Sequence, residues 1–118
     1  MSIKSIAAQV FAWLVYHKNK RWINRPVETQ QAVFLKLIAS AQHTQFGKDH
    51  AFANIKTHQD FSTQVPVRDY EALKPYVDRV VAGESNILWP GKPLYFAKTS
   101  GTTSGAKYIP LTDRKSVV

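Results

Sequence analysis

The chain has 118 residues, of which 44% are hydrophobic and 20% charged, and this ordinary globular balance excludes a disordered, collagen-like or repetitive protein. The absence of cysteine excludes disulfide scaffolds and thiolate metal sites, and it fits a cytoplasmic protein. A net charge of +8 occurs in proteins that bind nucleic acids or anionic membranes, although a basic cluster more often forms a solvated helix end.

The first predicted element is an amphipathic helix that begins near residue 3. Its apolar residues have the spacing of one helical face, and they are Ile3, Ile6, Ala7, Val10 and Leu14. The apolar stretch from Ile6 to Tyr16 is shorter than the roughly 20 residues that span a bilayer, and it has no signal-peptide cleavage site. We therefore expect this helix to dock on a domain, with contact at a membrane surface as the less favoured alternative.

Two further helices are predicted between residues 26 and 65. One begins at Pro26, which suits a first helical turn, and it ends before Gly47. Its predicted buried face comprises Phe34, Leu37, Ile38 and Ala41. The other begins at the pair Thr57 and Asp60, which has the spacing of a capping box, and it ends before Pro66.

The last predicted helix runs from about Asp69 to Ala82. Its apolar face comprises Leu73, Tyr76, Val77 and Val80. Pro75 is expected to divide it into two short pieces, because proline removes a backbone hydrogen bond. Gly83 is expected to end it in a left-handed conformation.

After residue 83 the pattern changes from helix to strand. Leu94 to Lys98 and Tyr108 to Leu111 are predicted to form a β-hairpin around the loop Thr99–Lys107. The predicted fold class is α/β, or α+β for this chain alone, with helices over 1–83 and the hairpin over 94–111. Because an isolated hairpin is marginally stable, we expect residues 1–118 to be the truncated N-terminal part of a longer domain.

The loop between the strands has the chemistry of a phosphate-binding site. Gly101 and Gly105 permit positive φ angles, so that successive N–H groups can converge on one anion. Lys107 adds a compact positive charge. Hydroxyl donors are provided by Ser100, Thr102, Thr103 and Ser104. A flexible, solvated loop is the alternative interpretation.

Other families of phosphate loop fit this sequence less well. A Walker A loop requires G-x-x-x-x-G-K-[ST] before a helix, whereas here Ala106 separates Gly105 from Lys107 and a strand follows. The G-x-G-x-x-G patterns of dinucleotide-binding folds and protein kinases are absent. The four histidines lack metal-ligand spacing, so no metal site is predicted; they are His17, His43, His50 and His58.

The nine residues Thr99–Lys107 resemble, at every position, the phosphate-loop signature of the adenylate-forming superfamily. The flanking segments resemble the GH3 family, which is known from plant auxin-responsive acyl-acid amido synthetases and is also found in bacteria. Those segments are Phe46-Gly-Lys48, Asp60-Phe61, Val65-Pro-Val67, Tyr70-Glu71, Pro75-Tyr76, Gly83-Glu84 and Tyr108-Ile-Pro-Leu-Thr112. The resemblance covers roughly residues 45–112.

This resemblance implies the start of an adenylate-forming N-terminal domain in an ATP-dependent ligase. Such an enzyme uses ATP and Mg²⁺ to activate a carboxylic acid as an acyl-adenylate, which an amine, usually of an amino acid, converts to an amide. The implied catalytic residue is Lys107. The implied ATP-binding residues are Thr99, Ser100, Gly101, Thr102, Thr103, Ser104, Gly105 and Lys107. Because the remaining substrate-binding segments are missing, we expect the chain alone to be inactive.

Besides a non-catalytic helical interaction protein in which the loop is a relic, two alternative functions remain open from the sequence. One is the acyl-CoA synthetase branch of the same superfamily, in which a thiol replaces the amine. The other is a small basic module that binds nucleic acid or polyphosphate, although nucleic acid is the less favoured partner. That module would use the loop together with the basic cluster Lys18, Lys20, Arg21 and Arg25.

Overall fold

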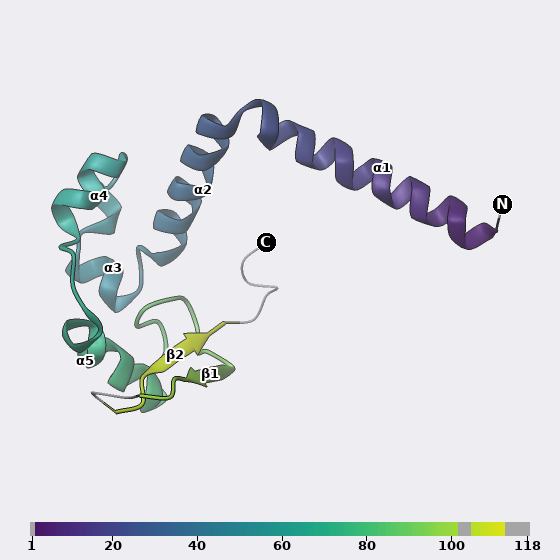
Figure 1. Cartoon of the computed structure of the whole chain (residues 1–118). Helices are drawn as coiled ribbons and strands as arrows, with labels where there is room; N and C mark the ends of the chain where they lie inside the picture. Colours follow the sequence, from purple (N-terminus) through teal and green to yellow (C-terminus); the bar gives the residue numbers. More distant parts are fainter. Residues whose placement is uncertain (1, 102–104, 113–118) are drawn as a thin grey trace. The chain divides into compact units, whose positions relative to one another are not determined.

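The computed structural model describes residues 2–101 and 105–112. The chain divides into two compact units, residues 1–35 and 36–118. Over the described range it is mostly helical and contains one two-stranded antiparallel sheet (Figure 1). The helical part and the hairpin predicted from the sequence are therefore both present. Residues 102–104, which belong to the predicted phosphate loop, lie outside the described residues.

The first unit contains helix α1 (Ile3–Asn24), which extends well beyond the predicted apolar stretch. The side chain of Ser2 caps it by accepting a hydrogen bond from the amide of Ser5. No residue of α1 is buried, so the structure gives no support to the predicted docking of its apolar face. Other apolar residues of α1 lie outside this face, since Tyr16 and Ile23 lie on other sides of the helix from Ile3. No helix in the described part of the chain is long and apolar enough to span a membrane.

Helix α2 (Pro26–Ala41) begins at the predicted proline. Ile38 and Ala41 are buried, but Leu37 is 45% exposed, so its predicted burial is wrong. Leu37 lies 100° around the helix from Ile38, and the buried face is too narrow to include it. The predicted end of this helix before Gly47 is confirmed, and Gly47 lies inside a separate short helix that was not predicted, α3 (Gln45–Asp49).

Contacts of Gly47 and Thr44 with the end of α2 fix the position of α3. A Cβ atom at Gly47 would clash with the carbonyl oxygen of Ala41, so only glycine allows α3 to turn back against the end of α2. The buried Thr44 caps α3 by accepting from the amide of Gly47, and its hydroxyl donates to the carbonyl of Ala41 at 2.7 Å. The amides of Gln45 and Phe46 donate to the carbonyls of residues 86 and 87, which holds this distant segment against α3.

Next come the 3₁₀ turn η1 (Phe52–Asn54) and helix α4 (His58–Gln64). The predicted capping box is confirmed, since the Thr57 hydroxyl accepts from the amide of Asp60 while the Asp60 carboxylate accepts from the amide of Thr57. Helix α4 ends before Pro66 as predicted, with Val65 in an extended conformation.

Helix α5 (Tyr70–Val81) is continuous through Pro75, so the predicted break is wrong. Pro75 removes a single hydrogen bond in the N-terminal half, and the buried Val77 and Val80 fix the following turn against the core. The predicted end at Gly83 is confirmed. Gly83 has φ +93°, and its amide and that of Glu84 bond back to the last turn in the pattern of a Schellman motif.

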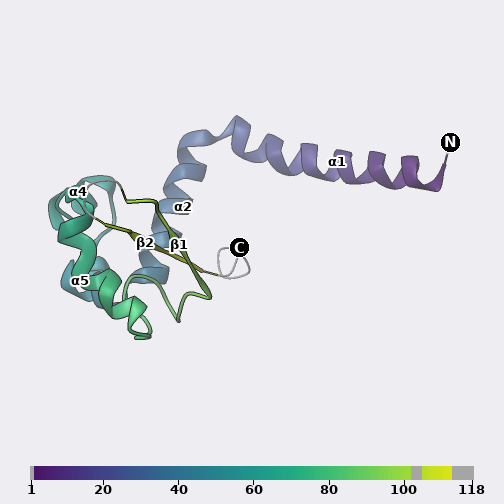
Figure 2. The ribbon, with the colours of Figure 1, turned by 60° about the horizontal axis from the view of Figure 1, so that its bottom comes forward.

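Strands β1 (Tyr95–Lys98) and β2 (Tyr108–Leu111) pair antiparallel, with Tyr95 opposite Leu111 and Lys98 opposite Tyr108. Helix α5 contacts β2, and the two views in Figures 1 and 2 both show the helix beside the hairpin. The hydrophobic core of this unit comprises Ile38, Ala41, Phe52, Ile55, Val77, Val80 and Ile87. Helix α5 therefore connects this core to the strand that leaves the predicted phosphate loop.

Candidate functional site

The hairpin closes the base of the predicted phosphate loop between Thr99 and Lys107. The amide of Thr99 donates to the carbonyl of Lys107 at 3.0 Å, and the amide of Lys107 donates to the Thr99 hydroxyl at 3.2 Å. The hydroxyl of Thr99 is therefore engaged with the backbone in this state. Its contribution is to fix the spacing of the two ends of the loop.

The two predicted glycines lie against each other above this base. A Cβ atom at Gly101 would clash with the backbone of Gly105, and Gly105 itself has φ +81°, a conformation that disfavours other residues. Both glycines, together with Ser100, are exposed. The structure thus brings Thr99 near Lys107 and Gly101 near Gly105 at the two ends of the loop.

A residue that sequence reasoning did not assign to the site, Tyr70, fixes the strand that leaves the loop. The Tyr70 hydroxyl accepts from the amide of Tyr108 at 2.9 Å and lies 3.2 Å from the carbonyl oxygen of the same residue, to which it donates. The two residues are 38 positions apart in the sequence. Tyr70 belongs to a segment that resembles the GH3 family, but no local pattern indicates its contact with β2.

The ring of Tyr70 also contacts the predicted catalytic lysine. The Nζ atom of Lys107 lies 5.4 Å from the centre of the ring, which is within cation–π range. Lys107 is half-buried. On the neighbouring strand, Nζ of Lys98 lies 5.9 Å from the ring centre of Tyr108, so a second cation lies at the base of the loop. This arrangement of amines and glycine backbone can bind an anion through charge and N–H groups.

The segment before α5 is anchored to α3 by polar side chains. Arg68 donates to Nε2 of the buried His50 at 2.9 Å. Because arginine has no acceptor, Nε2 of His50 accepts, and its Nδ1 therefore carries the proton that is donated to the carbonyl of Phe46 at 2.8 Å. The Arg68 guanidinium also lies 5.7 Å from the ring centre of Phe46. These contacts fix the chain just before Tyr70.

A second polar pair joins α3 to α5. The Tyr76 hydroxyl donates to a carboxylate oxygen of Asp49 at 2.7 Å. This hydrogen bond, followed by one from Gln45, lowers the pKa of Asp49, whereas burial and then the Asp49 contact raise the pKa of Tyr76. The pair contributes to the position of α5 and takes no part in the loop.

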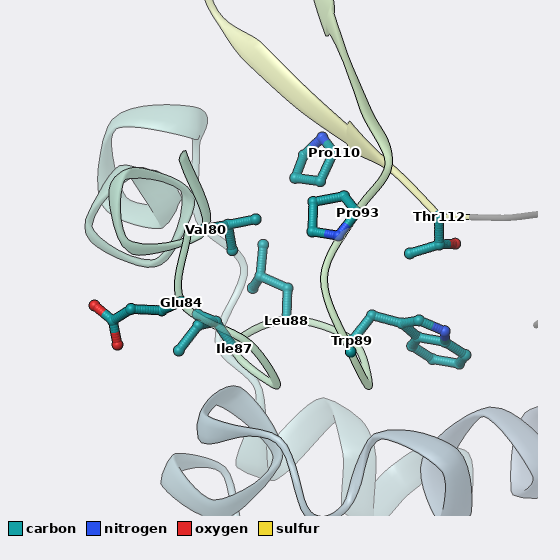
Figure 3. A pocket seen from close by; sticks show the side chains of 9 residues that line it. Val80, Glu84, Ile87, Leu88, Trp89, Pro93, Pro110 and Thr112 are labelled. Carbon is teal, nitrogen blue, oxygen red and sulfur yellow. The ribbon is translucent and has the colours of Figure 1, made fainter. Parts of the chain in front are cut away.

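A small apolar cavity lies at the opposite end of the hairpin from the loop. Its volume is about 20 Å³, which is room for about one water molecule. Figure 3 shows Val80 from α5 and Leu88 directed toward Pro93 and Pro110, with the Glu84 carboxylate pointing away. That carboxylate pairs with Arg79 at 2.7 Å. A space of this size and lining is a gap in the packing and cannot accommodate a substrate.

The basic cluster of the alternative function lies in the first unit. Lys18, Arg21 and Arg25 border an open hollow of about 570 Å³ together with Trp22 and residues of α2. Arg25 also approaches the carboxylate of Glu28 at 3.7 Å. Over residues 2–101 and 105–112, no three side chains of His, Cys, Asp or Glu gather into a possible metal site.

Comparison with known proteins identifies relatives of this chain. A family model described as the GH3 family N-terminal domain matches residues 15–117. Two indole-3-acetic acid-amido synthetases of Arabidopsis thaliana are 43% identical over 56 residues and 30% identical over 79 residues. A 4-substituted benzoates-glutamate ligase of the same plant is 44% identical over 48 residues. No solved structure matches the chain significantly.

The three alignments cover 46%, 66% and 40% of this chain, but only 9%, 13% and 8% of the relatives. The chain therefore spans about a tenth of the length of the curated relatives that it matches. Neither the nucleic-acid-binding module nor the acyl-CoA synthetase branch is favoured by these matches. The family match begins within α1 and extends over residues 15–117, which include the hairpin and its loop. The chain therefore belongs to the GH3 family.

Proposed function

We propose that this chain supplies the phosphate-binding loop of an ATP-dependent ligase that joins a carboxylic acid to an amino acid. In the first step, the carboxylate attacks the α-phosphate of ATP, which gives an acyl-adenylate and releases pyrophosphate. In the second step, the amine attacks the acyl carbonyl carbon and AMP leaves, so that an amide is formed. The names of the relatives, which are amido synthetases and an acid–glutamate ligase, support this reaction class.

The observation that carries the proposal is the glycine turn that closes at Thr99 and Lys107. The backbone of Gly101 lies so near that of Gly105 that a side chain at Gly101 would not fit, and Gly105 has a positive φ; a loop of glycines with such geometry can present its peptide groups to an anion. In the proposed site, the β- and γ-phosphates of ATP bind the segment from Ser100 to Gly105. Within it, Thr102, Thr103 and Ser104 would donate through their hydroxyl groups.

Lys107 has a separate proposed role. Its ammonium group offsets the negative charge that develops on pyrophosphate as it leaves, which is electrostatic stabilisation without any covalent step. Mg²⁺ would enter with the phosphates of ATP, since this ion is usually held by phosphates and only one or two carboxylates. The proposed location of this ligase is the cytoplasm, which the use of ATP and the absence of cysteine from these 118 residues fit.

The test is carboxylate-dependent exchange between ATP and pyrophosphate, measured in a GH3 enzyme that carries this chain as its N-terminal part. Lys107→Ala should slow the exchange about 10²-fold, the scale of losing one preorganised electrostatic contact. Lys20→Ala is the matched control, because Lys20 lies 5.8 Å from a tyrosine ring centre but belongs to α1. Unchanged exchange in Lys107→Ala would exclude the role proposed for this lysine.

A further inference from the structure

The strongest unassigned feature is the contact of Tyr70 with two consecutive residues at the exit of the loop. We propose that Tyr70 is a positioning residue, which holds Lys107 and the adjoining backbone in the arrangement that binds polyphosphate. This proposal rests on the proposed function of the loop. It adds a residue from α5 to a site that sequence reasoning placed entirely within Thr99–Lys107.

The hydroxyl of Tyr70 makes the two hydrogen bonds that a neighbouring strand would otherwise make with the backbone of Tyr108. The Lys107 carbonyl accepts from the amide of Thr99, and the Lys107 amide donates to the Thr99 hydroxyl, so the backbone groups of the next residue, Tyr108, point to the other edge of β2. Tyr70 accepts from the N–H group of Tyr108 and donates to its carbonyl. Further along this edge, Pro110 has no N–H group that needs a partner. One side chain therefore provides the hydrogen-bond partners for the backbone groups at the edge of β2, directly after the loop.

The ring of Tyr70 restrains the lysine itself. A lysine side chain has four flexible carbon–carbon bonds, and ordering it when a ligand binds reduces affinity. Contact with the ring at 5.4 Å restricts the ammonium group before the ligand arrives. The ammonium has three donors, so contact with a ring face leaves donors for phosphate oxygens. Because Lys107 and Tyr108 are adjacent, the ring and the hydroxyl fix the side chain and the backbone together.

Tyr70 can act as a support because it is fixed on both sides. It is the first residue of α5, whose cap Asp69 accepts from the amide of Ala72 at 2.9 Å. The preceding Arg68 is bound to the buried His50. The buried Val77 anchors the same helix in the core. The position of Lys107 is thus determined by the packed part of residues 36–112.

The test separates the hydroxyl from the ring by two substitutions in the full 118-residue chain. Tyr70→Phe retains the ring, and Tyr70→Leu removes both parts. Tyr95→Phe is the matched control, since Tyr95 is 72% exposed on β1. Three quantities are measured for each variant: the affinity for magnesium tripolyphosphate by calorimetry, the hydrogen exchange rate of the Tyr108 amide, and the NMR shift of the Lys107 ε-methylene protons.

We expect Tyr70→Phe to speed exchange at the Tyr108 amide, to retain the ring-current shift of Lys107, and to weaken tripolyphosphate binding about threefold. Tyr70→Leu should also abolish the ring-current shift and weaken binding about tenfold. Tyr95→Phe should change none of the three quantities. Partial rescue of affinity by the phenylalanine variant is the signature of a positioning role, because a general loss of structure would affect all signals of residues 36–112 alike.

Two results would overturn the assignment of Tyr70 alone. Binding as strong in Tyr70→Leu as in the unchanged chain, while Lys107→Ala weakens it, would show that the contacts are structural. Equal exchange at the Tyr108 amide in the unchanged and Tyr70→Phe chains would show that the hydroxyl does not hold β2. If Lys107→Ala and the unchanged chain bind tripolyphosphate equally, or neither binds, the proposed function of the loop fails and the positioning role fails with it.

Discussion

Two of the lysine–tyrosine pairs in this chain have similar distances but different origins. In α1, Nζ of Lys20 lies 5.8 Å from the ring centre of Tyr16, one helical turn away. In the second unit, Nζ of Lys107 lies 5.4 Å from the ring centre of Tyr70, which belongs to a different element. The first pair requires only that a helix forms. The second pair forms only when residues 36–112 fold. The ammonium group of Lys107 is therefore held in place by tertiary structure before any ligand binds.

The same contrast separates the apolar residues of the two units. In α1, Val10 and Phe11 are 54% and 69% exposed, whereas Phe52 and Val77 in the second unit are 6% and 2% exposed. Both units have apolar residues at helical spacing. The stability of α1 therefore depends on helix propensity and its cap, and that of the second unit on packing.

The largest expected effect is a loss of stability when a buried phenylalanine of the second unit is replaced, compared with an exposed phenylalanine of α1. Phe52→Ala should lower the free energy of unfolding of residues 36–112 by about 3 kcal/mol, because it removes a buried ring that contacts Phe46 and Phe61. Phe11→Ala should change it by less than about 0.5 kcal/mol, as is usual for exposed positions. Urea unfolding followed by Trp89 fluorescence, with Trp13 and Trp22 replaced by phenylalanine, measures the second unit.

Equal losses in the Phe52→Ala and Phe11→Ala chains would contradict the contrast between the units. That result would mean that the apolar face of α1 is buried in solution. The docking of this helix on a domain, which its apolar face predicts, would then be correct.

Much of the fold could be predicted because its signals are local. The capping box at Thr57 and Asp60, the helix start at Pro26 and the helix end at Gly83 each depend on a few adjacent residues. The two strands were placed within one residue of their observed ends for the same reason. Backbone geometry over short distances does not require knowledge of the tertiary structure.

The errors arose where distant packing decides the outcome. Pro75 remains in a continuous helix because buried residues on its C-terminal side hold that helix in place. The short helix α3 has no counterpart among the predicted elements, because it depends on the close approach of Gly47 to the end of α2. Of the candidate site, sequence indicated the loop, but the role of Tyr70 depends on a contact across 38 positions. No short motif contains that information.

A smaller loss of stability is expected when the cap of α4 is removed, and the matched change removes the cap of α1. Thr57→Ala should lower the stability of residues 36–112 by about 1 kcal/mol, because the capping box loses the acceptor for the amide of Asp60. Ser2→Ala removes the equivalent contact with Ser5 in α1 and should leave the unfolding of the second unit unchanged. Urea unfolding measures both variants, with Thr57→Ser as a control that retains the cap. A loss in Ser2→Ala as large as that in Thr57→Ala would show that the two units unfold together.

The smallest expected effect is a difference in acid sensitivity. The hydrogen bond from Tyr76 lowers the pKa of Asp49 below its ordinary value of 3.8, so this contact stabilises the second unit above that pH and its contribution is lost as the pH falls through the lowered pKa. Tyr76→Phe should therefore reduce the loss of stability between pH 6 and pH 2, while Tyr95→Phe should not. Helix α1 contains no Asp or Glu, so no carboxylate of its own can make it acid-sensitive. Unfolding curves that keep the same pH dependence in Tyr76→Phe would show that Asp49 gains nothing from the pair, and that other carboxylates of residues 36–112 cause the acid sensitivity.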